Sequence, residues 1–321
     1  MKSVDENRVN WIDFCRGGGM LLVLLGHTAF PFRSFVYGFH MPLFFVVSGL
    51  VYHEAKVCPF VKYAKKLLVP YGVYAVINLI CDLLFHIKEI DGYPLGTKII
   101  GLLYSRGTII WMPNCSPIWF LTCMFVALCI MYVVTRLNSD LLKHICVAVC
   151  AIVSYVLYIL GVPKLLWNVD TALMAVLFIW IGFQLKYYII YKINLLTAIC
   201  LGLIGSMSIF LNPGVEFNNN TYGNLFLMLF GAVGVCILAV KISSLIGNSN
   251  GKISSYIQWI GKNTIFFLSF DYLVGAVSRS LLNRMNLNEW MFVLVMKIIL
   301  LSVGCFVWNY IRDSRLKEKI L

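Results

Sequence analysis

The chain has 321 residues, of which 60% are apolar and only 12% are charged, and its formal net charge is +12. Soluble domains carry charges on about 25% of their residues, and a soluble fold of this length could not bury so many apolar side chains. The composition therefore excludes a soluble enzyme and a disordered chain, and it indicates a polytopic membrane protein. Because Lys and Arg punctuate apolar runs, as loop charges do in membrane proteins, we expect no nucleic-acid partner.

Ten apolar stretches approach the length of about 20 residues that a helix needs to cross a bilayer. These predicted spans are 11–30, 40–55, 67–86, 118–136, 143–161, 166–186, 194–212, 222–246, 257–278 and 289–311. The runs are continuous and do not alternate as the strands of a membrane barrel do. The predicted fold is therefore all-α, with about ten transmembrane helices.

An even number of spans places both termini on the same side of the membrane. Lys and Arg are more numerous in the loops of that side, which include Lys62, Lys65 and Lys66. The positive-inside rule therefore predicts cytoplasmic termini. In the long break between the third and fourth spans, we expect a short re-entrant or amphipathic piece around residues 98–111.

The strongest candidate site lies in the first predicted span, because a charge in the bilayer costs at least a few kcal/mol. Arg16 and His27 are eleven residues apart. In an α-helix this is three turns plus about 20°, so both side chains share one face, about 16 Å apart. Asp13 lies about 60° from Arg16 and can pair with it. Gly17–Gly19 and Gly26 leave this face open to a ligand or to another helix.

A purely structural interpretation of these residues is also open. Arg16, paired with Asp13, would then reach the inner headgroups, and His27 would form a hydrogen bond between helices. His40 precedes Pro42, which fits the first turn of the second span. His40 would lie at the outer boundary near His27, where two imidazoles suit proton transfer, or it would belong to an interfacial aromatic belt.

Other polar residues give weaker signals. Trp119 is as typical of a membrane-interface aromatic as of a wall of a substrate site. Several ionisable residues in apolar runs either line a cavity or pair with one another, namely Asp82, Asp170, Asp271 and Lys297. Residues 261–264 lack the upstream glycines of a phosphate-binding loop. No spacing suits a metal, so we expect none, and we interpret the 11 cysteines as buried free thiols.

Taken in chain order, these motifs resemble those of membrane acyltransferase family 3, whose members O-acylate bacterial polysaccharides and other glycans. Arg16 and His27 resemble its Arg-x10-His signature, and residues 39–49 resemble its second-span motif. Residues 117–121, 170–183 and 260–264 are similar to its later elements. The resemblance covers nearly the whole chain and implies one acyltransferase-type transmembrane domain, residues 1–321.

One departure from the family concerns Asp271. The segment after the Gly-Lys-Asn element often ends in a His in this family, whereas this chain reads Ser-Phe-Asp-Tyr over residues 269–272. If that His assists chemistry in relatives, either Asp271 or nothing takes its place here.

The resemblance implies transfer of an acyl group, usually acetyl, from cytoplasmic acetyl-CoA to a hydroxyl of an outward-facing or lipid-linked glycan, by a multi-pass protein of the inner membrane. The donor and the glycan, together with membrane lipids, are the expected partners, and self-association is left open. We expect a catalytic group of His27, Arg16 and Asp13, and a substrate-binding group of His40, Trp119, Lys262, Asn263 and Asp271. His27 would act as the general base or as a transient acyl carrier.

Two other classes of function compete with this interpretation. A transporter of a small polar solute or a lipid-linked sugar would use Arg16, His27 and Asp271 to line a permeation path. Transporters often have matched Pro-broken spans, whereas the prolines here fall at or near predicted span ends. A non-catalytic scaffold would have no need of the ionisable pair in the first span.

Overall fold

The computed structural model describes residues 9–87, 92–108, 110–112, 114–287 and 289–318. Within these ranges the regular elements are all helical, apart from one isolated β-bridge between Glu216 and Thr221. The helices, in chain order, are α1 (Asn10–Gly26), α2 (Arg33–Tyr37), α3 (His40–Leu50), α4 (Phe60–Tyr63), η1 (Ala64–Leu68), α5 (Val69–Phe85), α6 (Leu95–Tyr104), η3 (Ser116–Ile118), α7 (Trp119–Thr135), α8 (Asp140–Ile159), η4 (Leu166–Asn168), α9 (Val169–Tyr187), η5 (Tyr188–Lys192), α10 (Leu195–Leu211), η6 (Phe217–Asn219), α11 (Leu225–Ile246), α12 (Lys252–Lys262), α13 (Thr264–Asn283) and α14 (Trp290–Glu318).

Seven helical segments in the described chain are long and apolar enough to cross a membrane. They are Phe60–Phe85, Ser116–Thr135, Asp140–Ile159, Leu166–Lys192, Leu225–Ile246, Thr264–Asn283 and Trp290–Ser314. The other three predicted spans also contain helices, but α1, α3 and α10 have only 17, 11 and 17 residues. The all-α membrane fold is confirmed, whereas about ten spans and cytoplasmic termini stay predictions.

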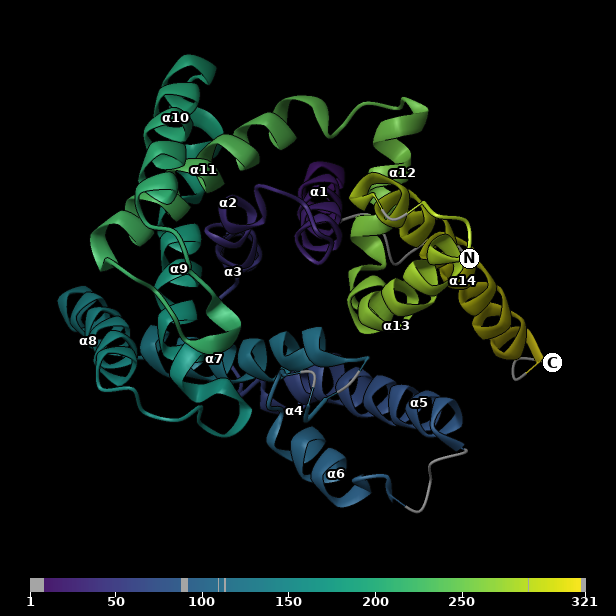
Figure 1. Cartoon of the computed structure of the whole chain (residues 1–321). Helices are drawn as coiled ribbons and strands as arrows, with labels where there is room; N and C mark the ends of the chain where they lie inside the picture. Colours follow the sequence, from purple (N-terminus) through teal and green to yellow (C-terminus); the bar gives the residue numbers. More distant parts are fainter. Residues whose placement is uncertain (1–8, 88–91, 109, 113, 288, 319–321) are drawn as a thin grey trace.

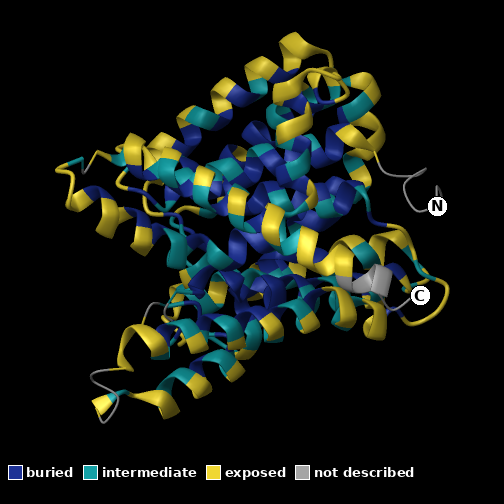
Figure 2. Ribbon diagram, turned by 90° about the vertical axis from the view of Figure 1, so that its right-hand side faces the viewer, coloured by how far each residue is buried: buried dark blue, intermediate teal, exposed yellow. Residues whose placement is uncertain are grey.

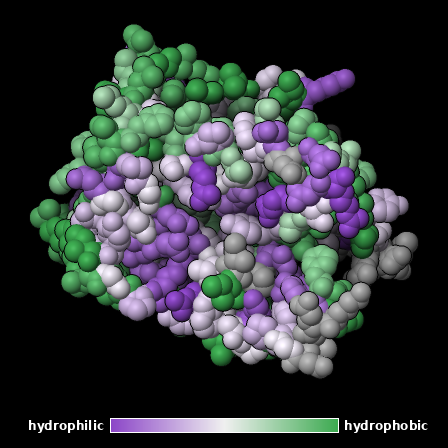
Figure 3. All heavy atoms as spheres, viewed as in Figure 1, coloured by the Kyte–Doolittle hydropathy of each residue, from purple (hydrophilic) through white to green (hydrophobic). Residues whose placement is uncertain are grey.

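The outer surface of the molecule is strongly apolar. Ile80, Ile152, Leu203 and Val303 on α5, α8, α10 and α14 are among many large hydrophobic side chains that are exposed. Figure 2 shows buried residues in the interior and exposed ones along the outer helices. Figure 3 shows hydrophobic side chains mainly along the upper and left edges of one face and hydrophilic ones in its middle. Lipid, and not water, is the solvent that suits such a surface.

The centre of the molecule is α1, which contacts α3, α11, α12, α13 and α14 (Figure 1). Glycines allow the closest of these contacts. A Cβ atom added to Gly17 would lie 1.9 Å from the carbonyl oxygen of Ile257 on α12, and one added to Gly261 would lie 1.8 Å from that of Asp13. The backbones of α1 and α12 therefore touch, and the side of α1 at Gly17 faces a helix and not a ligand.

The ninth predicted span, 257–278, is wrong as a single helix. It divides into the end of α12 and the start of α13, and Asn263 lies between them with φ −116° and ψ 20°. The Asn263 side chain donates to the carbonyl oxygen of Trp259, at 2.8 Å, which satisfies a backbone acceptor at the helix end. The division leaves Lys262 at the end of α12, beside the first turns of α1.

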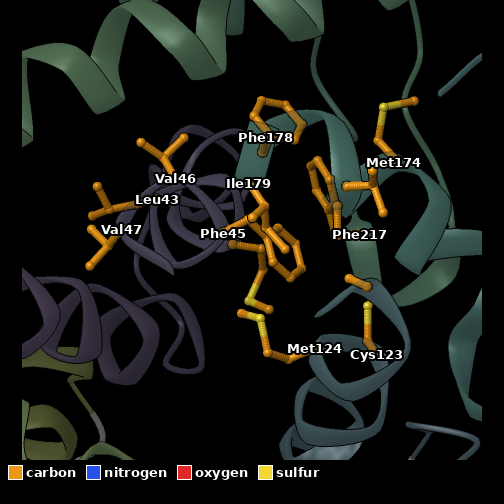
Figure 4. Close-up of a cluster of buried hydrophobic side chains, with 14 of the residues drawn as sticks. Leu43, Phe45, Val46, Val47, Cys123, Met124, Met174, Phe178, Ile179 and Phe217 are labelled. Carbon is orange, nitrogen blue, oxygen red and sulfur yellow. The ribbon is translucent and has the colours of Figure 1, made fainter. Parts of the chain in front are cut away.

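Helix α3 is held by a tightly packed core. Leu43, Phe45, Val46 and Val47 lie among side chains of α7, α9 and the segment before α11 (Figure 4). A Cβ atom on Gly182 of α9 would lie 2.1 Å from the carbonyl oxygen of Val46, so the two helices are in backbone contact. This packing fixes His40, the first residue of α3.

The long break before α7 contains α6, Leu95–Tyr104, which overlaps the first part of the re-entrant or amphipathic piece expected around residues 98–111. Tyr71 of α5 donates a hydrogen bond to the carbonyl oxygen of Leu102, which attaches α6 to the bundle. Gly101 lies against the backbone of Trp111, where a Cβ atom would be 2.4 Å from the carbonyl oxygen.

Candidate active site

A cavity of about 490 Å³ lies at the end of α1. Three residues singled out from the sequence line it together, namely His27, His40 and Trp119. They come from the end of α1, the start of α3 and the start of α7. The expected meeting of two imidazoles and an indole is therefore found in one place.

His27 is held by a carboxylate behind it. Its Nδ1 is hydrogen-bonded to Oδ2 of Asp271, from α13. The Asp271 side chain is fully buried, whereas that of His27 is 14% exposed. A carboxylate only accepts, so in neutral His27 the Nδ1 atom carries the proton and Nε2 keeps its lone pair. His27 is thus an oriented base at the wall of the cavity.

Asp271 has a second ionic partner. Its Oδ1 pairs with Nζ of Lys297 from α14, whose side chain is 1% exposed. The sequence left open whether Asp271 and Lys297 pair or line a cavity, and in the structure they pair. Asp271 was expected among the substrate-binding residues, but it lies behind His27 and is not one of the residues that line the cavity.

His40 is oriented by its own backbone. Its Nδ1–H donates to the carbonyl oxygen of Val36, at 2.8 Å. The lone pair of a neutral His40 is therefore also on Nε2. The ring of Tyr37 is close to both imidazoles, with its centroid 6.2 Å from that of His27 and 5.2 Å from that of His40.

The far wall of the cavity comes from the loop before α11. Glu216 and Asn218 line it, and sequence reasoning missed both. The Glu216 backbone is fixed by its bridge to Thr221, with N···O distances of 2.9 and 3.0 Å. The Glu216 carboxylate has no hydrogen bond or ion pair with the residues that the structure describes. A carboxylate in a loop otherwise free of acidic residues was the one signal that could have marked this wall.

A half-buried lysine supports the same wall. Nζ of Lys164 donates to Oδ1 of Asn218, at 2.7 Å, and lies 5.5 Å from the centroid of a Trp119 ring. Burial lowers the pKa of Lys164 to about 8. Asn218 in turn donates to the carbonyl oxygen of Gly107. These bonds join three loops around Trp119 and make the wall rigid.

A second, apolar cavity of about 350 Å³ continues from the first, because Val23, Met41 and Leu268 line both. Met20 also lines the second cavity. Arg16, Met20, Val23 and His27 follow the i, i+4, i+7, i+11 spacing of one helical face. The face of α1 that was predicted to join Arg16 to His27 thus has an apolar cavity along its middle.

The other end of this face is cationic. Arg16 lies 3.8 Å from Oδ1 of Asp13, as expected, and its side chain is 27% exposed. Lys262 is exposed at the end of α12, close to α1 because Gly261 packs on Asp13. Asn263 accepts a hydrogen bond from Asn309, at 3.1 Å. Lys262 and Asn263 therefore lie at the Arg16 end of α1 and not in the His27 cavity.

The remaining polar candidates are elsewhere. Asp82 binds Tyr93 and, at 2.9 Å, Asn114, whereas Asp170 is buried at the start of α9. The described residues include no group of three or more His, Cys, Asp or Glu side chains that could hold a metal. The cysteines are free thiols, but Cys58 and Cys200 are exposed, so their interpretation as buried is wrong for these two.

Comparison with known protein families matches residues 9–310 to an acyltransferase domain, that of acyltransferase family 3. Comparison with curated proteins and with solved structures gave no significant match. The matched range includes every residue of the two cavities and both ends of the Arg16–His27 face.

Proposed function

The chain belongs to acyltransferase family 3 and is a multi-pass membrane protein, and from this premise we propose that it transfers an acetyl group from acetyl-CoA to a hydroxyl of an outward-facing or lipid-linked glycan. The observation that carries the proposal is the oriented base, His27, at one end of a face whose other end is cationic. A cytoplasmic donor and an outward acceptor assign the protein to the cell membrane.

The cationic end suits the donor. Arg16 and Lys262 would bind the phosphates of CoA, for which guanidinium is a strong bidentate partner. The pantetheine arm would extend through the apolar cavity, which lies between Arg16 and His27 over about 16 Å of helix. The thioester would then reach the cavity that His27 and His40 line.

The reaction follows from the state of the two imidazoles. Nε2 of His27 accepts the proton of the acceptor hydroxyl as its oxygen attacks the thioester carbonyl. The tetrahedral intermediate collapses, the C–S bond breaks, and the imidazolium returns the proton to the sulfur of CoA. Asp271 stabilises the imidazolium that forms in between. His40 would orient the acceptor, and Trp119 would form a wall of the acceptor site.

The Arg16 end predicts a defect in donor binding. Replacing Arg16 by Ala removes one charge-assisted contact, worth about 1.5–3 kcal/mol, so we expect KM for acetyl-CoA to rise about tenfold or more. Arg16→Lys is expected to lie in between, because an ammonium makes a single contact. Steady-state kinetics measures both. Arg33→Ala, beside Tyr37 at the other end of α1, is the control. An unchanged KM in Arg16→Ala would leave Arg16 as a structural partner of Asp13 alone.

The far wall predicts a defect in acceptor binding. A carboxylate accepts hydrogen bonds from two hydroxyls of a sugar, and Glu216→Gln replaces one of its acceptors by a donor. We expect KM for the glycan to rise about tenfold, with KM for acetyl-CoA unchanged. Glu54→Gln, in an exposed loop, is the matched control. A rise in both KM values would contradict a role of Glu216 on the acceptor side.

Purified protein in lipid nanodiscs tests the proposal. Acetyl-CoA labelled in its acetyl group is added with extracted glycolipids, and label transfer and free CoA are measured together. We expect one CoA released for each label on glycolipid. Absence of transfer to any glycolipid, with solute flux through proteoliposomes, would instead support the transporter.

A further inference from the structure

We propose that Lys297 is a positioning residue for the acyl transfer proposed above: its charge neutralises Asp271, so that this carboxylate orients His27 without placing a second proton on it. The proposal depends on that function, since it concerns the base of the reaction. It adds a residue from the last helix that does not line the cavity.

Three helices bring the groups together. His27 follows α1, Asp271 lies on α13 and Lys297 on α14. Each oxygen of the carboxylate has its own partner, since Oδ2 bonds His27 and Oδ1 pairs with Lys297. The side chains of the lysine and the carboxylate are 1% and 0% exposed, so water does not screen either charge.

The side chain of Lys297 is fitted to this position. Its Nζ also lies 3.4 Å from the carbonyl oxygen of Leu24, in the last turn of α1. Its Cε lies 3.5 Å from where a Cβ atom of Gly275 would be, one turn after Asp271. The lysine thus lies along α13 and reaches both the carboxylate and the helix that ends at His27.

The balance of charges among His27, Asp271 and Lys297 determines how strongly protonation of His27 is favoured. A buried carboxylate with His27 as its only partner is neutralised when the imidazole takes a second proton. The proton would sit on Nε2, which could then not accept one from a hydroxyl. With Lys297 present, a protonated His27 shares the carboxylate with a second cation, so Asp271 stabilises the imidazolium less than it would as a partner of His27 alone. Lys297 therefore favours the neutral form of His27, in which Nε2 keeps its lone pair.

Other titratable groups also face His27. They are Tyr37 of α2, His40 of α3, Tyr272 of α13 and Glu216 of the loop before α11, whereas Arg279 lies near Lys297. Glu216 favours a protonated His27 and Arg279 opposes it, but both are exposed or partly exposed and act through a higher dielectric. None of them changes when Lys297 alone is replaced, so a comparison of variants isolates its charge.

The experiment is the pH dependence of kcat/KM for acetyl transfer, whose acid limb reports protonation of the base. Lys297→Met keeps a long unbranched side chain, one atom shorter than that of lysine, and removes its charge. We expect its acid limb to move to higher pH by about 1–3 units, because the Asp271 carboxylate, no longer paired with a lysine, stabilises protonated His27 more strongly. Lys297→Arg keeps the charge and is expected to keep the acid limb of the native chain. Lys241→Met is the control, since Nζ of Lys241, on α11, donates to the backbone carbonyl oxygen of Ile190 on η5, at 3.1 Å.

A further pair of variants keeps the test valid if Lys297→Met does not fold. Asp271→Asn leaves the lysine uncompensated, whereas Asp271→Asn with Lys297→Met removes both charges. We expect the acid limb of the single variant to lie at lower pH than that of the double variant. Equal acid limbs in this pair, or in Lys297→Met and the native chain, would overturn the role of Lys297. A native chain that transfers no acetyl group at any pH would instead refute the proposed function.

Discussion

His27→Ala is expected to lower the rate of acetyl transfer by about 10²–10⁴-fold, the contribution of a positioned general base. The structure gives His27 a fixed tautomer and a place at the cavity wall, so no neighbouring group takes over its lone pair in the same geometry. Initial rates with labelled acetyl-CoA measure the loss. Binding of acetyl-CoA is expected to change little, because the cationic end of α1 is intact.

Two controls make this result specific. His53→Ala removes an exposed imidazole in the loop after α3 and is expected to leave the rate unchanged. The thermal unfolding midpoint of His27→Ala reports whether the bundle still folds. A folded His27→Ala protein that transfers acetyl at the native rate would contradict the assignment of the base.

Asp271→Asn is the second change with a large expected effect. An amide at this position presents an N–H group to His27, which favours the tautomer with its proton on Nε2. That tautomer cannot accept the proton of the acceptor, so we expect kcat to fall about 10²-fold or more with KM for acetyl-CoA unchanged. Asp271→Glu is expected to recover part of the rate if its longer carboxylate still reaches His27.

The same change also affects stability. Removing one partner of a buried ion pair leaves Lys297 uncompensated, which costs about 3–5 kcal/mol. We therefore expect Asp271→Asn to unfold at a lower temperature than the native chain, and Asp271→Asn with Lys297→Met to recover part of this loss. Asp313→Asn, at the exposed end of α14, is the control for both rate and stability. An Asp271→Asn protein with native kcat would show that the carboxylate is not needed to orient the base.

The parts of the site that lie on one helix could be predicted from the sequence. Arg16 and His27 share a face because α1 is continuous over Asn10–Gly26, and helical periodicity is a local property. The sequence also placed His40 near His27 at the outer boundary and singled out Trp119, and the structure brings both to the His27 cavity. The roles of these residues remain predictions.

The parts that depend on contacts between distant segments could not be predicted. The sequence offered several buried charges but no way to decide that Asp271 pairs with Lys297, since this depends on how α13 and α14 pack. Glu216 reaches the cavity because Phe217 is anchored in the core beside Phe45 and Phe178 (Figure 4). Hydropathy is averaged over a whole span, so it did not reveal that α12 and α13 are separate helices that meet at Asn263.

The glycines of α1 could make room either for a ligand or for a close helix contact, and only the packing distinguishes the two. On α1, Gly17 lies against the backbone of α12, and Gly19 and Gly26 lie against Phe44 and Tyr37. Gly18 alone of the four faces open space. The open space along the middle of α1 is therefore the apolar cavity beside Met20 and Val23, and the glycines do not create it.

We expect the acetyl group to travel along α1 from the Arg16 end to an acceptor at the His27 end. Proteoliposomes with acetyl-CoA on one side and a soluble glycan on the other test it most directly. We predict that label appears on the glycan across the membrane when the Arg16 end faces the donor, and that no free acetyl-CoA or acetate crosses with it. Label on the glycan only when donor and acceptor share one compartment would contradict transfer along α1 across the membrane.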